Sequence, residues 1–420
     1  MKRTVRSEKE IWDEIWSRKG EKEELALSRV KLALDLLGSP QALFASVLSL
    51  GEGKRSASRL LESLLRSYGV RAGLFCPQAK GLEGCIKVNG ESPSPKRLSD
   101  LYEELENFLS LAEERFEKEG MGRMGPMEVL LCFAALEFSD EPVDDAVFEV
   151  PGGREDLFSA LRASGVIFTP SPSAPLPLDL IAPSSFALST RQEEGAEEEL
   201  EERALEAGAC LMVDGRDLEV ENDLGAVGGQ VADLITPRGL YPQVPIKLFG
   251  EFQAHFALLA LAAGEKLLSE GKLEEDLVSE AFSTVSVPGS LKVIGSKPLT
   301  LSDAASSPFK MDLCLSALKE AFNPSSLVAV VAAGKEFQPS SLEVLENSCD
   351  FLIATQVAGG MGAEGLFNLA QASFGSRSLC IPDFSSALEK GREAALGQEG
   401  GCALVTGCME AALAAQRELN

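Results

Sequence analysis

The sequence predicts an α/β protein with two domains, and three observations support this. Short apolar runs alternate with longer segments whose apolar residues recur at helical spacing, which is typical of a parallel sheet covered by helices. The 420 residues, 45% of them hydrophobic, are enough to form two or three cores. The alternation begins again near Val287-Pro288-Gly289. We therefore predict one domain over residues 1–286 and a second over residues 287–420.

The first part of the chain predicts a βαβ unit between two amphipathic helices. Apolar residues recur at helical spacing in 23–37 and 98–116, with charged residues on the other face. Between them, 43–50 is an apolar run of strand length, a Gly-rich turn and a helical stretch follow, and 70–76 is β-like again. This order is typical of a parallel α/β sheet.

The remainder of the first domain continues the alternation. It is predicted to contain a helix at 127–138, strands at 145–150 and 166–169, and a buried helix at 251–270. Residues 169–192 are rich in Pro and Ser without a sustained period, so we predict a mobile loop or lid there. The acidic run 193–206 is interpreted as the solvated face of a helix.

Charge and composition exclude several classes of function. The 39 Lys and Arg against 65 Asp and Glu give a net charge of −26, which excludes a broad nucleic-acid or anionic-membrane surface. No apolar stretch is long enough to span a bilayer, the N-terminus lacks the apolar run of a secretory signal, and none of the nine cysteines forms a C-x-x-C pair. A cytoplasmic protein with reduced thiols is predicted. The single histidine, His255, excludes a zinc site built on several histidines.

The Gly-rich turn at 51–56 is the strongest chemical signal in the sequence. Backbone N–H groups at a helix start bind phosphate, a Lys bridges phosphates, and a Ser hydroxyl can ligate Mg²⁺. Leu48 stands where the first Gly of the pattern G-x-x-x-x-G-K-[ST] belongs, so an ordinary turn with an exposed Lys is the alternative. The residues predicted to bind a nucleotide are Gly51, Gly53, Lys54, Arg55 and Ser56.

The segments around this turn resemble those of the folylpolyglutamate/dihydrofolate synthases, a family of the Mur ligase superfamily. LGSPQ at 37–41 and GEGKRS at 51–56 resemble the family's LGxPQ and GTNGKGS, and RAGLF at 71–75 and IKVNGE at 86–91 resemble RVGLF and IxVNGE. Further matches in the same order lie at 127–129, 143–154, 199–217, 250–253, 288–289, 303–308 and 404–407. The likeness therefore extends over nearly the whole chain.

The resemblance implies a central P-loop-type ATPase domain with a parallel-rich sheet and a smaller C-terminal Rossmann-like domain. In such ligases, ATP phosphorylates a folate-like carboxylate and the amine of glutamate attacks the acyl phosphate. Carried over by position, Lys54 and Ser56 would hold phosphate and Mg²⁺, and Glu149 would bind Mg²⁺. The alternative for Glu149 is a salt bridge to Arg154. Asp303 matches the Asp of the family's Asp-Gly-Ala-His-Asn-Pro segment and is the one candidate for a remnant of the catalytic residues. The alternative is that its carboxylate caps the following helix.

The departures from the family pattern fall on the positions that carry chemistry. Glu52 places a negative charge beside the phosphates, at a cost of about 1–4 kcal/mol unless it is paired. Arg55 is a candidate to neutralise Glu52 or to bind phosphate itself, so nucleotide binding is predicted to be weakened rather than lost. The family's carbamylated Lys and its Asp-His pair have no counterpart in 170–192, so the second metal site is predicted to be lost. The family's His-Gln-x-x-Asn is Phe-Gln-Ala-His-Phe at 252–256, and its Asp-Gly-Ala-His-Asn-Pro is Asp-Ala-Ala-Ser-Ser-Pro at 303–308.

Three functional hypotheses follow. The first is a folylpolyglutamate-synthase-like protein with lost or strongly reduced ligase activity and a binding or regulatory role. The second is an active ATP-dependent ligase that adds glutamate to a folate-like or other acidic small molecule. The third is a small-molecule-binding protein that uses no nucleotide. Among the other reactive groups, His255 is interpreted as a structural or core histidine, and Cys76 as a buried thiol rather than a nucleophile.

Overall fold

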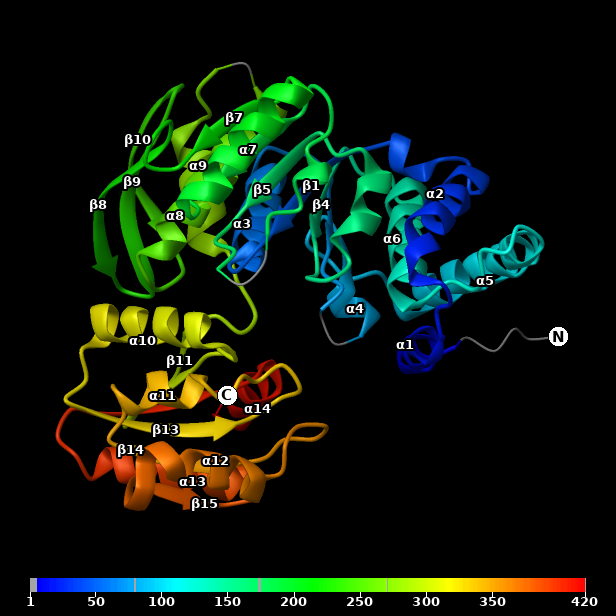
Figure 1. The fold of residues 1–420 in the computed structure, drawn as a ribbon. Coiled ribbons are helices and arrows are strands. Elements are labelled where there is room, and N and C mark those ends of the chain that lie inside the picture. Colours follow the sequence, from blue (N-terminus) through cyan, green and yellow to red (C-terminus); the bar gives the residue numbers. More distant parts are fainter. Residues whose placement is uncertain (1–5, 79–80, 173–174, 270, 420) are drawn as a thin grey trace. The chain divides into compact units, whose positions relative to one another are not determined.

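The computed structural model describes residues 6–78, 81–172, 175–269 and 271–419, with the backbone alone for Glu194. The chain divides into two compact units, each with its own sheet (Figure 1). The first unit comprises Met1–Glu221, Asp233–Val244 and His255–Val285, and the second comprises Asn222–Ala232, Pro245–Ala254 and Ser286–Asn420. The predicted α/β class with parallel-rich sheets is confirmed.

The first unit is built on a seven-stranded sheet in the order β3-β2-β4-β1-β5-β6-β7. Every neighbouring pair is parallel except β2 and β3. Strand β1 is central, paired with β4 on one side and β5 on the other. The strands are β1 Ala45–Leu50, β2 Ala72–Phe75, β3 Ile86–Val88, β4 Asp145–Glu149, β5 Gly165–Phe168, β6 Phe186–Ser189 and β7 Cys210–Val213.

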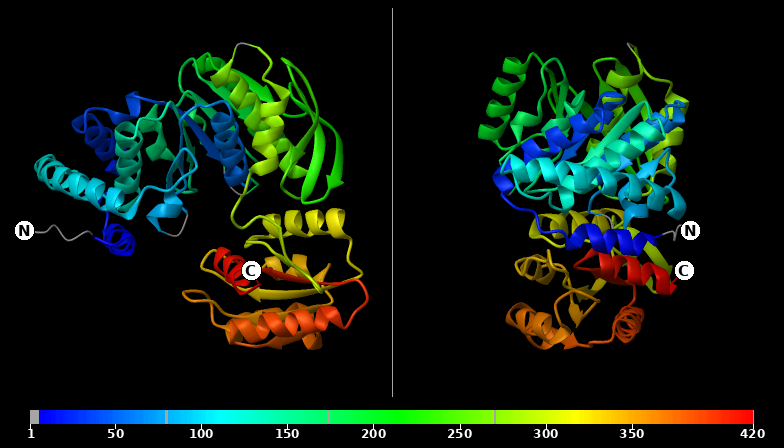
Figure 2. Two further views of the ribbon diagram at one scale, coloured as in Figure 1. Left: turned by 180° about the vertical axis from the view of Figure 1, so that it is seen from behind. Right: turned by 90° about the vertical axis from the view of Figure 1, so that its right-hand side faces the viewer.

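Helices cover this sheet, and they confirm the amphipathic segments predicted from the sequence. In Figure 1, α2, α5 and α6 lie on one side of the sheet and α3, α8 and α9 lie on the other. The two views in Figure 2 show α3 and α9 packed side by side. The helices are α1 Glu8–Ser17, α2 Ala26–Leu36, α3 Lys54–Ser67, α4 Leu82–Cys85, α5 Pro95–Lys118, α6 Pro126–Asp140, α7 Glu194–Ala207, α8 Phe252–Leu268 and α9 Glu275–Thr284. None in the described part of the chain is long and apolar enough to cross a bilayer.

Two stretches differ from the predictions. The loop predicted over 169–192 is wrong in two places, because the segment contains a 3₁₀ turn at Leu178–Leu180 and strand β6 at Phe186–Ser189. This strand escapes sequence patterns because it has four residues and is flanked by Pro and Ser. No strand was predicted between 219 and 246, where β8 Glu219–Ala226, β9 Gly229–Thr236 and β10 Gly239–Ile246 form a sheet in the order β10-β9-β8.

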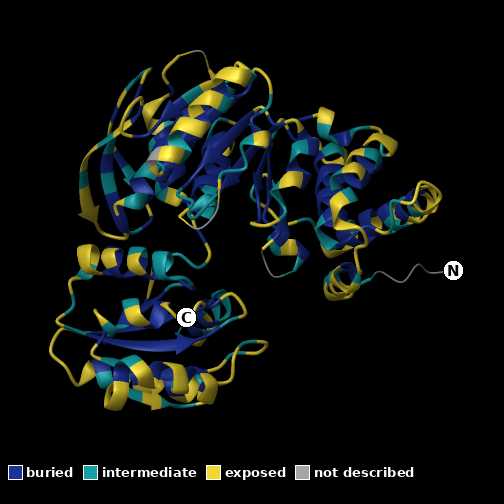
Figure 3. Ribbon diagram, in the orientation of Figure 1, coloured by how far each residue is buried: buried dark blue, intermediate teal, exposed yellow. Residues whose placement is uncertain are grey.

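The second unit contains a six-stranded sheet in the order β11-β12-β16-β13-β14-β15. Successive residues of β13 point to opposite faces, so Leu327 and Ala329 join one core while Val328 and Val330 join the other. Figure 3 shows this strand buried along its length. The elements are β11 Lys292–Ser296, β12 Leu299–Ser302, α10 Pro308–Phe322, β13 Ser326–Ala332, α11 Ser341–Glu346, β14 Phe351–Thr355, α12 Ala363–Phe374, β15 Ser378–Cys380, α13 Phe384–Leu396, β16 Gly401–Thr406 and α14 Met409–Leu419.

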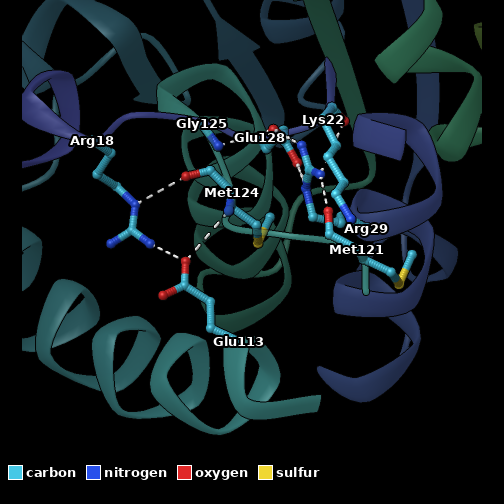
Figure 4. Close-up of polar contacts among 8 residues, drawn as sticks. All are labelled: Arg18, Lys22, Arg29, Glu113, Met121, Met124, Gly125 and Glu128. Atoms are coloured by element: carbon cyan, nitrogen blue, oxygen red, sulfur yellow. Dashed lines mark hydrogen bonds and ion pairs between the residues drawn. The ribbon is translucent and has the colours of Figure 1, made fainter. Parts of the chain in front are cut away.

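A buried ion pair joins the N-terminal helices (Figure 4). Arg29 of α2 is fully buried and donates from Nε and Nη2 to the two carboxylate oxygens of Glu128 on α6, across 2.8 and 2.9 Å. Its Nη1 donates to the carbonyls of Lys22 and Met121, and the amide of Gly125 donates to Glu128. Because both charged groups have near-ideal partners, the pair holds helices α2 and α6 in one arrangement.

A second ion pair extends this cluster toward α1 and α5. Arg18, just after α1, forms an ion pair with Glu113 of α5 and donates from Nε to the carbonyl of Met124 across 3.3 Å. The amide of Met124 donates back to Glu113 (Figure 4). Both the amide and the carbonyl of Met124 therefore have side-chain partners, which fix the loop before α6.

Candidate functional site

The carboxyl ends of β1, β4 and β5 meet at one edge of the first sheet. Register places Ser49 of β1 opposite Glu149 of β4, and Leu50 opposite Phe168 of β5. Thr169, immediately after β5, donates from both its amide and its hydroxyl to the carbonyl of Leu50. In open α/β sheets this is the edge at which ligands bind, beside the central strand.

The Gly-rich turn leaves β1 at this edge and enters helix α3. Gly51 and Gly53 have φ of +88° and +106°, in the left-handed region that glycine adopts at little cost. Helix α3 begins at Lys54, whose Nζ donates to the carbonyl of Gly51 across 3.4 Å. The hydroxyl of Ser49 donates to the carbonyl of Lys54 and so ties the strand to the helix start. The predicted strand–turn–helix geometry is present.

An aromatic ring packs against this turn. A Cβ on Gly53 would lie 2.2 Å from Cζ of Phe256, so only a glycine fits beneath the ring. Phe256 belongs to α8 and is 1% exposed. The family resemblance places an asparagine at this position. The side chain that packs against the turn is therefore one that can neither donate nor accept a conventional hydrogen bond.

A cavity of about 140 Å³ lies on the β5 side of the turn. Its charged lining residues are Glu52, Lys54 and Glu155, and the remainder comes from the ends of β1 and β5 and the Pro-rich segment that follows. The cavity is smaller than the about 300–1,000 Å³ that ligand pockets typically measure. Two carboxylates against one ammonium make it a poor place for a triphosphate.

Glu149 lies on the other side of the turn, surrounded by donors. It is 1% exposed, its Oε2 is 3.9 Å from Nε of Arg55, and its Oε1 is 4.0 Å from Nε of Arg59. The thiol of Cys76, which follows β2, donates to Oε1 across 3.0 Å. The salt bridge considered for Glu149 therefore exists, but its partners are Arg55 and Arg59. Nη2 of Arg154, the partner expected from sequence, has no hydrogen bond to any described residue.

The structure places the other predicted residues as follows. Ser56 is buried in the first turn of α3, where its amide donates to the carbonyl of Gly53. Asp303 follows β12 in the second unit and accepts the amide of Ala305 across 2.7 Å. The alternative that Asp303 caps the next helix is wrong, because Ser307 is the N-cap residue of α10, and its role as a catalytic remnant stays a prediction. The carboxylate of Asp303 holds a turn before the helix instead.

His255 and Cys76 both have structural partners. Nδ1 of His255 on α8 lies 2.7 Å from Oδ2 of the buried Asp214, and the His255 side chain is one-third exposed. It is thus a half-buried helix residue rather than a core one, and the pair links α8 to the turn after β7. Cys76 is confirmed as a buried thiol, and burial followed by the Glu149 charge raises its pKa well above the usual value.

The groups that face Glu149 are not the ones that Mg²⁺ prefers as ligands. Mg²⁺ takes hard oxygen ligands in octahedral geometry, whereas the groups set against Glu149 are two guanidiniums and a protonated thiol. Within the described ranges, no group of three or more His, Cys, Asp and Glu side chains is arranged to hold a metal ion. The predicted pairing of Ser56 with Glu149 as Mg²⁺ ligands therefore does not fit this donor set.

Comparison with known proteins finds relatives of this chain among the folylpolyglutamate synthases. A curated dihydrofolate synthase/folylpolyglutamate synthase from Mycobacterium tuberculosis is 29% identical over 365 residues, covering 79% of this chain and 74% of that protein. A solved structure of folylpolyglutamate synthase from the same organism, complexed with ADP, matches 98% of this chain and 97% of its own, with a TM-score of 0.87 and 26% identity. The chain is a homologue of the folylpolyglutamate synthases, in the Mur ligase superfamily.

The fold persists in more distant synthases. The crystal structure of folylpolyglutamate synthase from Thermotoga maritima matches 98% of this chain and 96% of its own, with a TM-score of 0.81 at 20% identity. No model of a known protein family matches the sequence. The relatives confirm the resemblance predicted from the sequence motifs. The loss of ligase activity through replaced polar residues stays a prediction.

Proposed function

We propose that this chain is a nucleotide-binding homologue of folylpolyglutamate synthase with lost or strongly reduced ligase activity and a binding or regulatory role. In this proposal, residues 1–286 form the ATPase domain and residues 287–420 the Rossmann-like ligase domain. The relative in complex with ADP supports a nucleotide as the ligand. Its binding residues here would be Gly51, Gly53, Lys54, Arg55 and Ser56.

The turn supports retained binding. Two left-handed glycines bring the backbone round so that helix α3 begins directly at the carboxyl end of the central strand. The dipole of this 14-residue helix favours an anion at its first turn. Lys54 adds a positive charge one residue after the second glycine.

The observation that carries the loss of activity is the ring of Phe256 against Gly53. Transfer of a phosphoryl group depends on polar groups fixed around the developing charge. A buried ring beside the turn supplies none, and Glu52 and Glu155 line the neighbouring cavity with negative charge. Loss of one such polar group commonly lowers a rate about 10²–10³-fold. Several losses together support a protein that binds without turning over.

The test combines binding with turnover. The melting temperature is measured with ADP and with ATP for the wild type, Lys54→Ala and Lys31→Ala, each compared with its own ligand-free form. Lys31 is an exposed residue of α2 and serves as the matched control. We expect saturating nucleotide to raise the melting temperature by a few degrees in the wild type and the control but not in Lys54→Ala.

Release of ADP is then followed with ATP, glutamate and a reduced folate. We expect no glutamate-dependent release. Glutamate-dependent release that Lys54→Ala abolishes would establish the active-ligase alternative instead. A melting temperature unchanged by either nucleotide would contradict nucleotide binding and favour the third hypothesis, a small-molecule site without a nucleotide.

A further inference from the structure

The surroundings of Glu149 point to an anion site rather than a cation site. This carboxylate lies in the first unit where β2, β4 and the first turns of α3 converge, and burial of a single negative charge requires opposite charge nearby. The opposite charge is present twice over. Arg55 and Arg59 lie one helical turn apart on α3, so both side chains reach the carboxylate from the same face.

The Nε atoms of the two guanidiniums form ion pairs with Glu149 but no hydrogen bonds to it. Their Nε atoms stand 3.9 and 4.0 Å from its oxygens, which is beyond hydrogen-bond distance. Nε of Arg59 is buried and donates to no described residue, and its Nη2 reaches only the sulfur of Cys76 at 3.6 Å. A buried N–H group without a hydrogen-bond acceptor costs free energy, and an anionic oxygen that accepted from it would recover that cost.

The cluster is also accessible from one direction. The Arg59 side chain is 11% exposed, whereas that of Arg55 is 30% exposed and lies in the first turn of α3 beside the Gly-rich turn. A phosphate oxygen arriving at the helix start could therefore accept from Arg55 first and from the deeper Arg59 next. Guanidinium forks match phosphate oxygens in geometry as well as charge.

We propose that Arg55 and Arg59 supply at this turn the positive charge that a divalent cation supplies in the related ligases, so that phosphate groups bind here without a metal. The inference rests on the proposed nucleotide binding and specifies how the charge of the phosphates is met. Glu149 then orients the two guanidiniums and is not a metal ligand. Two fixed cations beside one carboxylate repel Mg²⁺ from the position that the family resemblance assigns to it.

The test measures ADP affinity by titration calorimetry on the full chain, in Mg²⁺ and in EDTA. We expect the dissociation constant to change by less than about threefold between the two conditions. Arg59→Met keeps the length of the side chain and removes its charge, and it should weaken ADP binding in EDTA by about tenfold or more. Arg66→Met is the matched control, because Arg66 lies on the same helix and pairs with another buried carboxylate, Glu62.

The outcomes separate the inference from the function on which it rests. ADP binding that requires Mg²⁺ would overturn the metal-free site and leave nucleotide binding intact. No ADP binding in either condition would overturn both. A folded Arg59→Met variant that binds ADP with wild-type affinity in EDTA would also overturn the inference. If that variant does not fold, the ADP affinities of the wild type in Mg²⁺ and in EDTA decide the question.

Discussion

Two buried carboxylates in the first unit are paired with arginine in different ways. Glu128 is met by Arg29 in a bidentate contact at 2.8 and 2.9 Å, and carbonyls and an amide satisfy the rest. Glu149 has two arginines, neither closer than 3.9 Å, and one buried donor atom of Arg59 has no described partner. A network whose donors and acceptors all have partners stabilises the fold, whereas one with an unsatisfied donor can still bind a ligand.

The largest expected effect on stability comes from breaking the ion pair between Arg29 and Glu128. Arg29→Met should lower the free energy of unfolding by about 3–5 kcal/mol, because it leaves Glu128 buried without its charge partner. Arg59→Met should cost less than half as much, because Glu149 keeps Arg55 and the Cys76 thiol. Urea denaturation measures both. Arg115→Met, which breaks an exposed pair with Glu119, is the control and should cost about 0–1 kcal/mol. Equal losses at 29 and 59 would mean that both pairs are structural.

The next largest effect concerns the Gly-rich turn, which lies beside Glu149 and its two arginines. Gly53→Ala should cost about 2–4 kcal/mol, because its Cβ would overlap the ring of Phe256 and its φ of +106° is strained for alanine. Gly69 also has a left-handed backbone, but a Cβ added there would meet no atom within 4 Å. Gly69→Ala therefore measures the cost of the left-handed backbone by itself, which we expect to be about 1–2 kcal/mol. Thermal unfolding of the two variants gives the difference. Equal losses of stability in the two variants would show that the ring of Phe256 moves aside for the added Cβ.

The smallest effect concerns a third carboxylate, at the opposite end of β4 from Glu149. Burial and then the neighbouring Asp144 raise the pKa of Asp145 to about 6. A raised carboxyl pKa means that the ionised form is disfavoured in the fold, so the penalty is absent below the unfolded-state pKa, still small near pH 4, and complete above pH 6. Asp145→Asn should therefore add about 1 kcal/mol at pH 7.5, after allowance for partial exposure, and about nothing at pH 4.

The pH series on this variant needs one comparison. Asp312→Asn changes an exposed aspartate of α10 and should leave unfolding unchanged at both values. A gain for Asp145→Asn that is equal at pH 4 and pH 7.5 would trace the effect to the amide itself rather than to ionisation.

Sequence patterns predicted the sheet and helices around the turn because each element there has its own periodicity and boundary. The strands at 219–246 were missed because Gly225, Gly228 and Gly239 interrupt a stretch that also carries several acidic residues. Motif comparison singled out Gly51 and Lys54 through the Gly-rich turn and the family-like segments around it. It could not find that Arg59 and Cys76 surround Glu149, since these three residues are separated in the chain and come together only through the strand order β2-β4-β1.

The central place of β1 has a consequence for experiments in solution. Its backbone is paired on both edges and most of its side chains are buried, so its amide hydrogens exchange with solvent only when the first unit opens as a whole. The turn that begins at Gly51 is thus attached to the most slowly exchanging part of that unit. Protection that a ligand adds at the turn should stop abruptly at Leu50, and this boundary would locate the ligand without a variant.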